Sequence, residues 1–592
     1  MDIPTTIKQL YKQGIFSELD IYFAKFILTL AQCAHHEELL LGSVLVSHLT
    51  AQGHTCLDLT VWADQWFPAF PEPGINTLHC PLLAPWLAAL QNCSVVGHPG
   101  DYAPLILDQY RLYLYRYWDY EQQLATQIRV RTNQQYGYIN YGILEAGLSH
   151  LFPNENQSIV DRQQQAALTA LLHHFSVISG GPGTGKTATI IKIIVLLLEQ
   201  NLNLNIALAA PTGKAAARLQ ETLKQTLSHL NCADEIKSVM PREAYTIHRL
   251  LSKSSNSSLI PSDDSSWLPY DVIIIDEASL VDLALMTQLA QVIPISSRWI
   301  LVGDKDQLAS VEAGTVLGDI CEASCSSPSH FRQDQIVFLD KSYRFGENSG
   351  IELLAQAVNQ GQADKALQIL KAENYPEVNW YSLGISENLP IQLLNPIIAH
   401  VQLCLLENQP EIILNQLEQI KILCATRWGR YGVVAVNRQV EEELSKRGLI
   451  RIESTWYHGQ PIIITRNDYT LKLFNGDIGI ILRDVHSQHK LRAFFPSVEP
   501  GQYRCFWPNR LPEHETVYAM TLHKSQGSEF NQVLILLPPQ LSPLFTREWV
   551  YTGITRARHR VSLWGNEKVF KEMVSRKMNR VSGLYEKLVQ VD

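Results

Sequence analysis

The sequence has few cysteines and no long apolar run. Its ten cysteines are scattered over 592 residues without a Cys-x-x-Cys pair, and no second pair or histidine cluster accompanies Cys321 and Cys325. This pattern favours reduced thiols over a zinc site or disulfides. The longest apolar stretches, around 190–198 and 39–46, are shorter than the roughly 18 residues of a membrane span. Since Met1-Asp-Ile-Pro also lacks the basic start of a secretory signal, we expect a cytoplasmic protein that does not enter a membrane.

Positive charge is scarce in the first 110 residues. They hold three Lys or Arg and ten Asp or Glu, whereas residues 111–592 carry 46 basic and 48 acidic side chains. An acidic surface repels the phosphate backbone of DNA. We therefore expect nucleic acid to bind elsewhere, because binding depends on where charge lies and not on the net charge of −9.

A glycine-rich turn lies between an apolar strand and an apolar helix. The stretch 179–187 contains G-x-x-x-x-G-K-T, follows a short apolar run at 175–179, and precedes a predicted helix at 188–199. In such a P-loop, backbone N–H groups and the helix N-terminus bind phosphate, the lysine reaches the β- and γ-phosphates, and the threonine hydroxyl binds Mg²⁺. The residues predicted to bind ATP here are Gly180, Gly181, Pro182, Gly183, Thr184, Gly185, Lys186 and Thr187. The sequence thus predicts a site for ATP and Mg²⁺.

Two further apolar runs end in polar side chains. The run 272–275 leads to Asp276 and Glu277, and another leads to Gln307. Beside a P-loop, we expect Asp276 to join the Mg²⁺ shell, Glu277 to polarise the attacking water, and Gln307 to sense the γ-phosphate. Such runs, alternating with helical sequence, predict an α/β fold with a parallel sheet.

These blocks and those after them resemble a superfamily 1 helicase over residues 160–565. The further blocks are Ala209-Ala-Pro-Thr212-Gly-Lys214, Tyr245-Thr246-Ile-His248, Leu339-Asp-Lys-Ser-Tyr-Arg344, Thr521-Leu-His523-Lys524-Ser525-Gln526-Gly527 and Thr555-Arg556. The resemblance implies that Arg344 and Arg556 reach the γ-phosphate from a second motor domain. It also implies an adenine-reading glutamine, Gln163, whose register Gln164 and Gln165 leave open. The resemblance also implies that Gly527 binds ATP. The implied contacts to single-stranded DNA are Thr212, Lys214, Thr246, His248, Thr521, His523 and Ser525.

Within that superfamily the chain is similar to the RecD branch, the alpha subunit of exodeoxyribonuclease V (RecBCD), in the 1B group. Trp456-Tyr-His-Gly-Gln-Pro461, Asn475-Gly-Asp-Ile-Gly479 and Leu112-Tyr-Leu114 carry this similarity. It implies two RecA-like P-loop motor domains with parallel sheets, a mainly helical N-terminal domain and a small, SH3-like β-barrel insertion in the second motor domain. The expected divisions are 1–110 for a partner-docking domain, 111–160 for linker helices, 161–335 and 336–592 for the motor domains, and about 470–515 for the insertion.

The N-terminal region also carries its own patterns. Leu40 to Leu49 follow the rhythm of a helix face, and Gly53 stands where a glycine would end that helix. Residues 108–128 are predicted to form a charged, Tyr-rich helix. Aromatic residues between 62 and 86 belong either to a small core or to a docking surface.

The RecD resemblance implies an ATP-dependent 5′→3′ helicase that acts on single-stranded and duplex-end DNA. Its partners would be RecB- and RecC-like subunits in a heterotrimer for double-strand-break repair, homologous recombination and degradation of linear DNA. Cutting would belong to the RecB-like chain, since we find no nuclease carboxylate cluster in this one. One alternative is a stand-alone RecD-like helicase, but such relatives have a longer N-terminal extension. The other alternative is an assembly subunit that binds nucleotide but has little motor activity. The intact ATP-site residues argue against this alternative.

Overall fold

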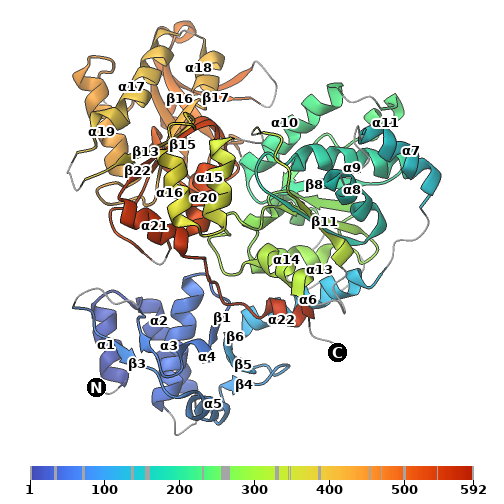
Figure 1. Ribbon diagram of the computed structural model, residues 1–592, viewed down its shortest axis with the longest axis vertical. Coiled ribbons are helices and arrows are strands. Elements are labelled where there is room, and N and C mark those ends of the chain that lie inside the picture. The colour runs from blue at the N-terminus through green and yellow to red at the C-terminus, as the bar shows by residue number, and fades with distance from the viewer. Residues whose placement is uncertain are drawn as a thin grey trace.

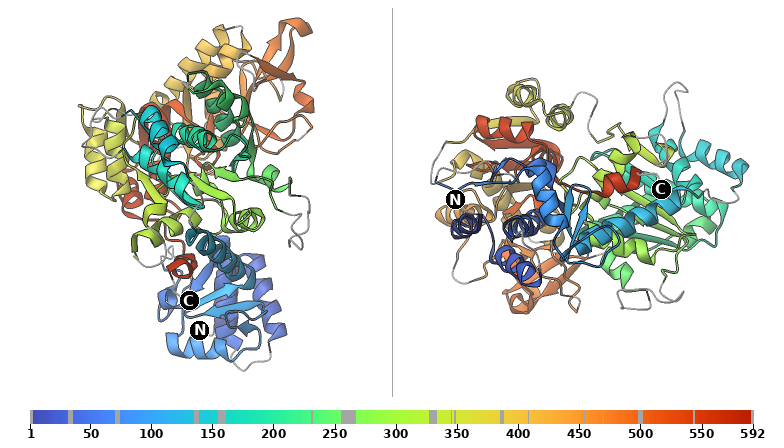
Figure 2. Two further views of the ribbon diagram at one scale, coloured as in Figure 1. Left: turned by 90° about the vertical axis from the view of Figure 1, so that its right-hand side faces the viewer. Right: turned by 90° about the horizontal axis from the view of Figure 1, so that it is seen from below.

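Three parts follow one another along the chain in the structure, which is a computed structural model (Figure 1). The N-terminal domain lies below two α/β domains that stand side by side, and Figure 2 shows it as a lobe of its own. The residues that the structure describes are 3–31, 36–69, 74–134, 139–153, 161–229, 232–254, 267–326, 333–344, 346, 349–384, 388–407, 409–452, 455–468, 470–497, 502–542 and 544–589.

The first α/β domain is built on a six-stranded parallel sheet. Its strands are β7 (Phe175–Gly180), β8 (Ile206–Ala210), β9 (Ala244–Thr246), β10 (Val272–Ile275), β11 (Arg298–Gly303) and β12 (Ile336–Leu339). They lie in the order β12-β7-β11-β10-β8-β9. β7, β10 and β11 are buried along their whole length, because each packs on helices at both faces. The predicted parallel α/β fold is confirmed.

Helices cover both faces of this sheet (Figure 1). One face carries α7 (Tyr141–Leu151), α8 (Arg162–Leu172), α9 (Lys186–Gln200), α10 (Gly213–His229) and α11 (Asp234–Val239). The other face carries α6 (Tyr115–Thr132), α12 (Ile247–Leu251), α13 (Leu283–Val292), α14 (Val316–Ser326) and α22 (Leu584–Val589), with the short 3-10 turns η2 (Ala278–Leu280) and η3 (Gln333–Gln335) nearby. Successive strand residues divide between the two faces: Ile178 packs under α9, and Val177 packs on the opposite side.

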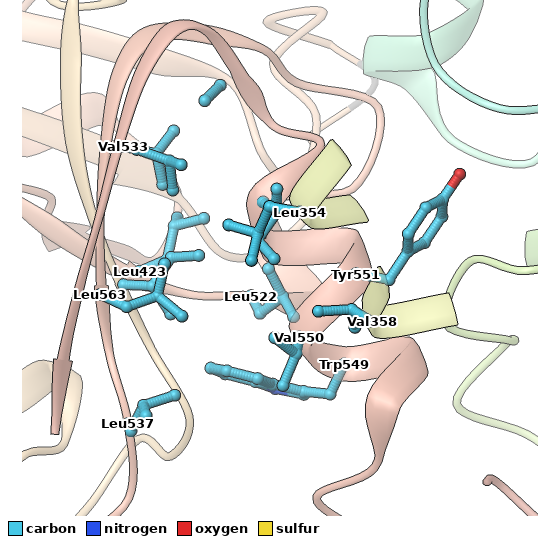
Figure 3. Close-up of a cluster of buried hydrophobic side chains, with 14 of the residues drawn as sticks. Leu354, Val358, Leu423, Leu522, Val533, Leu537, Trp549, Val550, Tyr551 and Leu563 are labelled. Atoms are coloured by element: carbon cyan, nitrogen blue, oxygen red, sulfur yellow. The ribbon is translucent and has the colours of Figure 1, made fainter. Parts of the chain in front are cut away.

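The second α/β domain repeats this plan with five parallel strands in the order β13-β22-β21-β14-β20. The strands are β13 (Val378–Ser382), β14 (Ile420–Cys424), β20 (Ala519–Thr521), β21 (Phe530–Leu536) and β22 (Ala557–Gly565). The helices are α15 (Gly350–Asn359), α16 (Ala363–Lys371), α17 (Ile391–Leu406), α18 (Pro410–Gln416), α19 (Val433–Lys446), α20 (Arg547–Ile554) and α21 (Glu567–Ser575), with η6 (His523–Ser525) after β20. Figure 3 shows Leu423, Val533 and Leu563 of the sheet facing side chains of α15 and α20.

An antiparallel sheet is inserted between β14 and β20. It consists of β15 (Gln460–Ile464), β16 (Ile478–Asp484), β17 (Lys490–Pro496), β18 (Tyr503–Phe506) and β19 (His514–Thr516), with the short turns η4 (Val485–Ser487) and η5 (Pro508–Arg510). The strand order is β18-β17-β16-β15-β19. The insertion was predicted to start near 470, but its sheet starts earlier, because β15 begins at Gln460 and pairs with both β16 and β19. Closure of these strands into a barrel is not confirmed.

The N-terminal domain is helical on one side and contains a small sheet. Its helices are α1 (Ile3–Lys12), α2 (Glu18–Leu30), α3 (His36–Ala51), α4 (Leu59–Trp62) and α5 (Leu83–Gln91), and its strands are β1 (Cys56–Asp58), β2 (Trp66–Phe67), β3 (Leu78–His79), β4 (Val96–Gly97), β5 (Leu105–Asp108) and β6 (Arg111–Leu114). The predicted helix around 40–49 is confirmed by α3, and Gly53 has the positive φ of 97° of a residue after a helix end. Trp86 and Phe67 belong to the core of this domain, whereas Trp66 is exposed.

Two predicted boundaries need correction. Residues 108–114 do not form a helix: β5 and β6 make a hairpin turned at Gln109 (φ 53°), so a division at 110 cuts that hairpin. The Leu-Tyr alternation there has the two-residue period of a strand, and α6 begins only at Tyr115. Likewise β12 pairs with β7, so the first motor domain extends past 335. Of the predicted linker 111–160, residues 135–138 and 154–160 lie outside the described part. The division into domains otherwise stays a prediction.

After the second α/β domain the chain returns to the first. α22 packs on α6 and α14 (Figure 1). In the segment before it, Val581 accepts a hydrogen bond from Thr55 N and donates one to His54 Nδ1 of the N-terminal domain. The fully buried Glu121 of α6 accepts hydrogen bonds from Thr55 Oγ1 (2.6 Å), Gly583 N (3.0 Å) and Lys587 Nζ (3.0 Å). This buried, multiply bonded carboxylate therefore links the N-terminal domain, α6 and the C-terminal segment of the chain. Among the described helices, none is long and apolar enough to cross a membrane.

Candidate nucleotide and DNA site between the motor domains

The P-loop connects the end of β7 to the start of α9. Gly183 and Gly185 both have φ of 81°, a conformation that favours glycine and that turns the chain tightly before the helix begins at Lys186. Lys186 Nζ donates hydrogen bonds to the carbonyl oxygens of Gly180 (2.6 Å) and Gly181 (3.0 Å). The ammonium group therefore lies against the loop, where it can meet phosphate oxygens at the N-terminus of α9.

The predicted adenine-reading glutamine lies next to this loop. Gln163 Nε2 donates a hydrogen bond to Thr184 O at 3.0 Å, whereas Gln165 Oε1 accepts one from Arg162 in an exposed contact. The side chain of Gln163 also touches the loop at Gly185. This geometry favours the register with Gln163.

The two carboxylates follow the end of β10, which β11 separates from the P-loop strand β7. Asp276 is buried, and its backbone N–H donates to Ala209 O of β8 (2.9 Å). Burial and the charge of Glu277 raise the pKa of Asp276 to about 6, against the lowering effect of Lys186. Glu277 is held at φ 53°, a left-handed conformation that costs energy for a non-glycine residue and clusters at functional sites.

Gln307 is tied into the interface between the two motor domains. Its amide donates to Asp304 Oδ2 (3.0 Å), which also accepts from the Tyr551 hydroxyl of α20 (3.1 Å). Figure 3 shows Tyr551 at the edge of the second-domain core, with its hydroxyl pointing away from the other labelled side chains. The next residue, Leu308, packs into that core, and its backbone N–H donates to Thr552 Oγ1 at 2.8 Å. Gln307 is therefore linked to α20 through Asp304 and Leu308.

The two predicted arginine fingers occupy different places. The backbone N–H of Tyr343 donates to Gly183 O at 2.7 Å, and a side chain on Gly183 would meet Arg344 Cβ at 2.4 Å. Arg344 thus stands directly on the P-loop. Arg556 is buried within the second motor domain, where it donates to Thr552 O (3.2 Å) and Ser528 O (3.3 Å).

The predicted DNA contacts lie at the carboxyl ends of β8, β9 and β20. In the first motor domain, Thr212 accepts from Ala215 N at the start of α10 and Thr246 caps α12, with His248 exposed beside it. In the second, Thr521 is half-buried and His523 is exposed. Ser525 does not fit the prediction: it is fully buried and its hydroxyl donates to Leu522 O (2.7 Å).

Lys214 lies under the insertion. Burial lowers its pKa, while the nearby carboxylates of Glu418 and Asp477 act to raise it. The side chain of Phe474 lies 3.2 Å from the place that a Cβ on Gly213 would take, so the insertion contacts the first motor domain next to Lys214. This predicted DNA contact is therefore partly covered by acidic residues of the second domain.

Comparison with known proteins gives the family. Residues 12–113 match the N-terminal domain of the RecBCD enzyme subunit RecD, 163–313 an AAA domain, and 516–564 the UvrD-like helicase C-terminal domain. The RecBCD enzyme subunit RecD of Mycolicibacterium smegmatis is 37% identical over 547 residues, which cover 90% of this chain and 91% of that protein. The chain belongs to the RecD family. The Haemophilus influenzae RecD subunit is 30% identical over 98% of both chains.

The chain is also similar, more distantly, to two other helicases. The ATP-dependent RecD2 DNA helicase of Deinococcus radiodurans is 28% identical over 72% of this chain, but the match covers 52% of RecD2. A solved structure of Pif1 helicase from Candida albicans has 14% identity, a TM-score of 0.37 and covers 70% of this chain. With its RecD membership and its two RecA-like domains, this chain is an ATP-dependent DNA helicase and binds nucleotide.

Sequence reasoning missed several residues of the site. Asp304, Tyr551 and Glu529 link its parts, and the sequence patterns assigned a role to none of the three. A strand end next to Gln307 was a usable signal for Asp304. Tyr551 and Glu529 gave no signal, because their roles depend on which elements the fold brings together.

Proposed function

We propose that this RecD chain is the 5′→3′ helicase subunit of a heterotrimer with RecB- and RecC-like subunits. It would act on single-stranded and duplex-end DNA in double-strand-break repair, homologous recombination and the degradation of linear DNA. The observation that carries the proposal is the contact between the P-loop and the segment of Arg344, together with predicted DNA-binding residues on both motor domains. Nucleotide-dependent movement of these domains would then change the grip on a DNA strand.

ATP hydrolysis would use residues from both sides of this contact. Lys186 would leave the carbonyl oxygens of the loop to bind the β- and γ-phosphates, and Glu277 would accept a proton from the attacking water. Arg344, and Arg556 on closure of the cleft, would stabilise the charge that develops on the γ-phosphate. Gln307 would pass the loss of that phosphate to α20 through Asp304 and Leu308.

A magnesium ion fits the residues at this site. Within the described ranges, no group of three or more His, Cys, Asp or Glu side chains could hold a metal ion by itself. Mg²⁺ normally binds one or two protein ligands and the oxygens of a phosphate substrate. Asp276, a buried carboxylate, and Thr187, at the start of α9, supply that number. When bound with ATP, Mg²⁺ would neutralise phosphate charge.

The subunit role is better supported than either alternative. The N-terminal match at 12–113 is to the RecD subunit, and RecD subunits of two species align over nine-tenths or more of this chain. The stand-alone RecD2 relative aligns over about half of its own length. An assembly subunit without motor activity would not need the contacts that join Gln307, Tyr551 and the P-loop.

Unwinding of tailed duplexes tests the proposed motor. The purified chain is expected to unwind, with ATP, a duplex with a 5′ single-stranded tail and not one with a 3′ tail. Lys186→Gln is the control, and it is expected to abolish unwinding because the phosphates lose their ammonium partner. DNA-stimulated ATP hydrolysis without unwinding would show that the motor needs its partner subunits. A preference for the 3′ tail would contradict the proposed direction.

The N-terminal domain offers an apolar face for a partner subunit. Leu19, Tyr22 and Phe26 of α2 are 71%, 67% and 58% exposed and follow one another at helical spacing on one side of the helix. Exposed apolar residues that gather on one face mark interaction sites. We therefore propose that this face of α2 docks the chain onto its RecB- or RecC-like partner.

Co-purification tests this docking face. The double variant Tyr22→Glu and Phe26→Glu is expected to weaken binding to co-expressed partner subunits at least about tenfold, since large aromatic side chains dominate interface energies. The control is Tyr102→Glu, which places one such charge at a 92% exposed tyrosine outside α2. Equal loss in both variants, or no loss in either, would exclude α2 as the docking face.

A further inference from the structure

Glu529 lies at a meeting point of three arginines from different parts of the chain. Its Oε1 is 2.6 Å from Arg218 of α10 and 2.5 Å from Arg344, and its Oε2 is 3.1 Å from Arg558 of β22. The Glu529 side chain is only 9% exposed. Charge-assisted contacts of this kind are the strong ones among hydrogen bonds. One buried carboxylate therefore joins the first motor domain, the segment on the P-loop and the second motor domain.

The electrostatics show that Glu529 is held in its charged form. Burial acts to raise its pKa, but the charges of Arg218, Arg344 and Arg556 place that pKa well below its usual range. Burial and the neighbouring cations Arg218 and Arg556 lower the pKa of Arg344, although Glu529 opposes this. Arg218, Arg344 and Arg556 outnumber the single carboxylate of Glu529, although Asp276 and Glu277 also act on Arg218. Such a cluster has electrostatic capacity for a further anion.

Arg344 lies between the P-loop and Glu529. Its backbone is fixed to the P-loop through the contact of Tyr343 with Gly183 O, whereas its guanidinium extends to Glu529 on the other motor domain. A phosphate bound by the P-loop would lie on the near side of the same side chain. Rotation of the Arg344 side chain alone would exchange one anionic partner for the other.

We propose that Glu529 is a positioning residue that holds the Arg344 guanidinium in the nucleotide-free protein and releases it to the γ-phosphate of ATP. This inference rests on the proposed function, which assigns Arg344 to the γ-phosphate. A ligand shifts an equilibrium only through its different affinity for the two states. Because ADP has no γ-phosphate to compete with the carboxylate, Glu529 lowers the affinity for ATP and leaves that for ADP unchanged.

Binding of AMP-PNP and of ADP to the full chain, measured by calorimetry, tests the inference. Glu529→Gln keeps the size of the side chain and removes its charge. It is expected to tighten AMP-PNP binding about tenfold, the scale of one charge-assisted contact, and to change ADP binding less than about twofold. Weaker AMP-PNP binding, or an equal change for both nucleotides, would overturn the inference. A wild-type chain that binds neither nucleotide would overturn the proposed function as well.

Two further variants separate the role of Glu529 from a general effect of charge. Glu443→Gln removes a carboxylate of α19 that pairs with Arg447 (2.9 Å) and Lys446 (4.0 Å), all within one helix, and should leave both affinities unchanged. In an Arg344→Gln background, Glu529→Gln is expected to have no effect on AMP-PNP. The same gain with and without Arg344 would overturn the assignment to this arginine.

A structure of the wild-type chain with ADP and beryllium fluoride provides a test without substitution. The Arg344–Glu529 distance, now 2.5 Å, is expected to exceed 4 Å, with the guanidinium turned to the fluoride that mimics the γ-phosphate. Persistence of the 2.5 Å contact would overturn the inference even if the Glu529→Gln protein does not fold.

Discussion

Replacing Arg344 by glutamine is expected to lower kcat for ATP hydrolysis about 10³-fold or more, the range found for arginine fingers. The guanidinium would stabilise charge that develops on the γ-phosphate, and an uncharged amide cannot replace it. ADP binding should change little, since the finger meets only the terminal phosphate. The measurement is steady-state ATPase with saturating single-stranded DNA, together with ADP affinity from calorimetry.

A surface arginine supplies the control for this variant. Arg438 is 79% exposed and pairs with Glu442 on its own helix, so Arg438→Gln should leave kcat unchanged. Because Arg344→Gln also removes one partner of the buried Glu529, the midpoint of thermal unfolding should be measured alongside. A stable Arg344→Gln protein that keeps more than a tenth of wild-type kcat would contradict the assignment of the finger.

Local patterns explain why much of the motor could be predicted from the sequence. The strands β7, β8, β10 and β11 are short apolar runs that lead into glycine or polar residues, and each is followed by helical sequence. A strand that is buried on both faces is apolar throughout, so its position can be predicted from its own residues. Asp276, Glu277 and Gln307 were found in the same way, because they follow these strands, whereas Gln163 and Arg344 came only from the resemblance to helicases.

Features that depend on pairing partners could not be predicted in this way. β12 comes just before the block of Arg344, so the sequence suggested the second motor domain, yet the strand completes the first sheet beside β7. The alternation in β6 is typical of a strand, but its antiparallel partners β1 and β5 could not be identified from the sequence. The arginines around Glu529 are more than 300 residues apart at the extremes, and only the fold brings them together.

Replacing Glu277 by glutamine is the second change with a large expected effect. The amide has the size of the carboxylate but cannot accept a proton from water, so kcat is expected to fall about 10²- to 10⁴-fold. ATP binding should persist, because Lys186 and the P-loop backbone are unchanged. The positive φ of residue 277 is the same strain for glutamine as for glutamate, which makes this variant a test of charge and not of backbone.

The pKa of Asp276 supplies an independent check on that variant. The charge of Glu277 is one of the causes that raise it to about 6, so removing this charge is expected to lower it, and Asp276 would stay ionised to a lower pH. NMR titration of the labelled carboxyl group, in the absence of nucleotide, measures this shift. A fall in kcat with the Asp276 pKa unchanged would mean that the charge of Glu277 does not act on Asp276. Retained hydrolysis with a lowered pKa would move the role of general base from Glu277 to another residue.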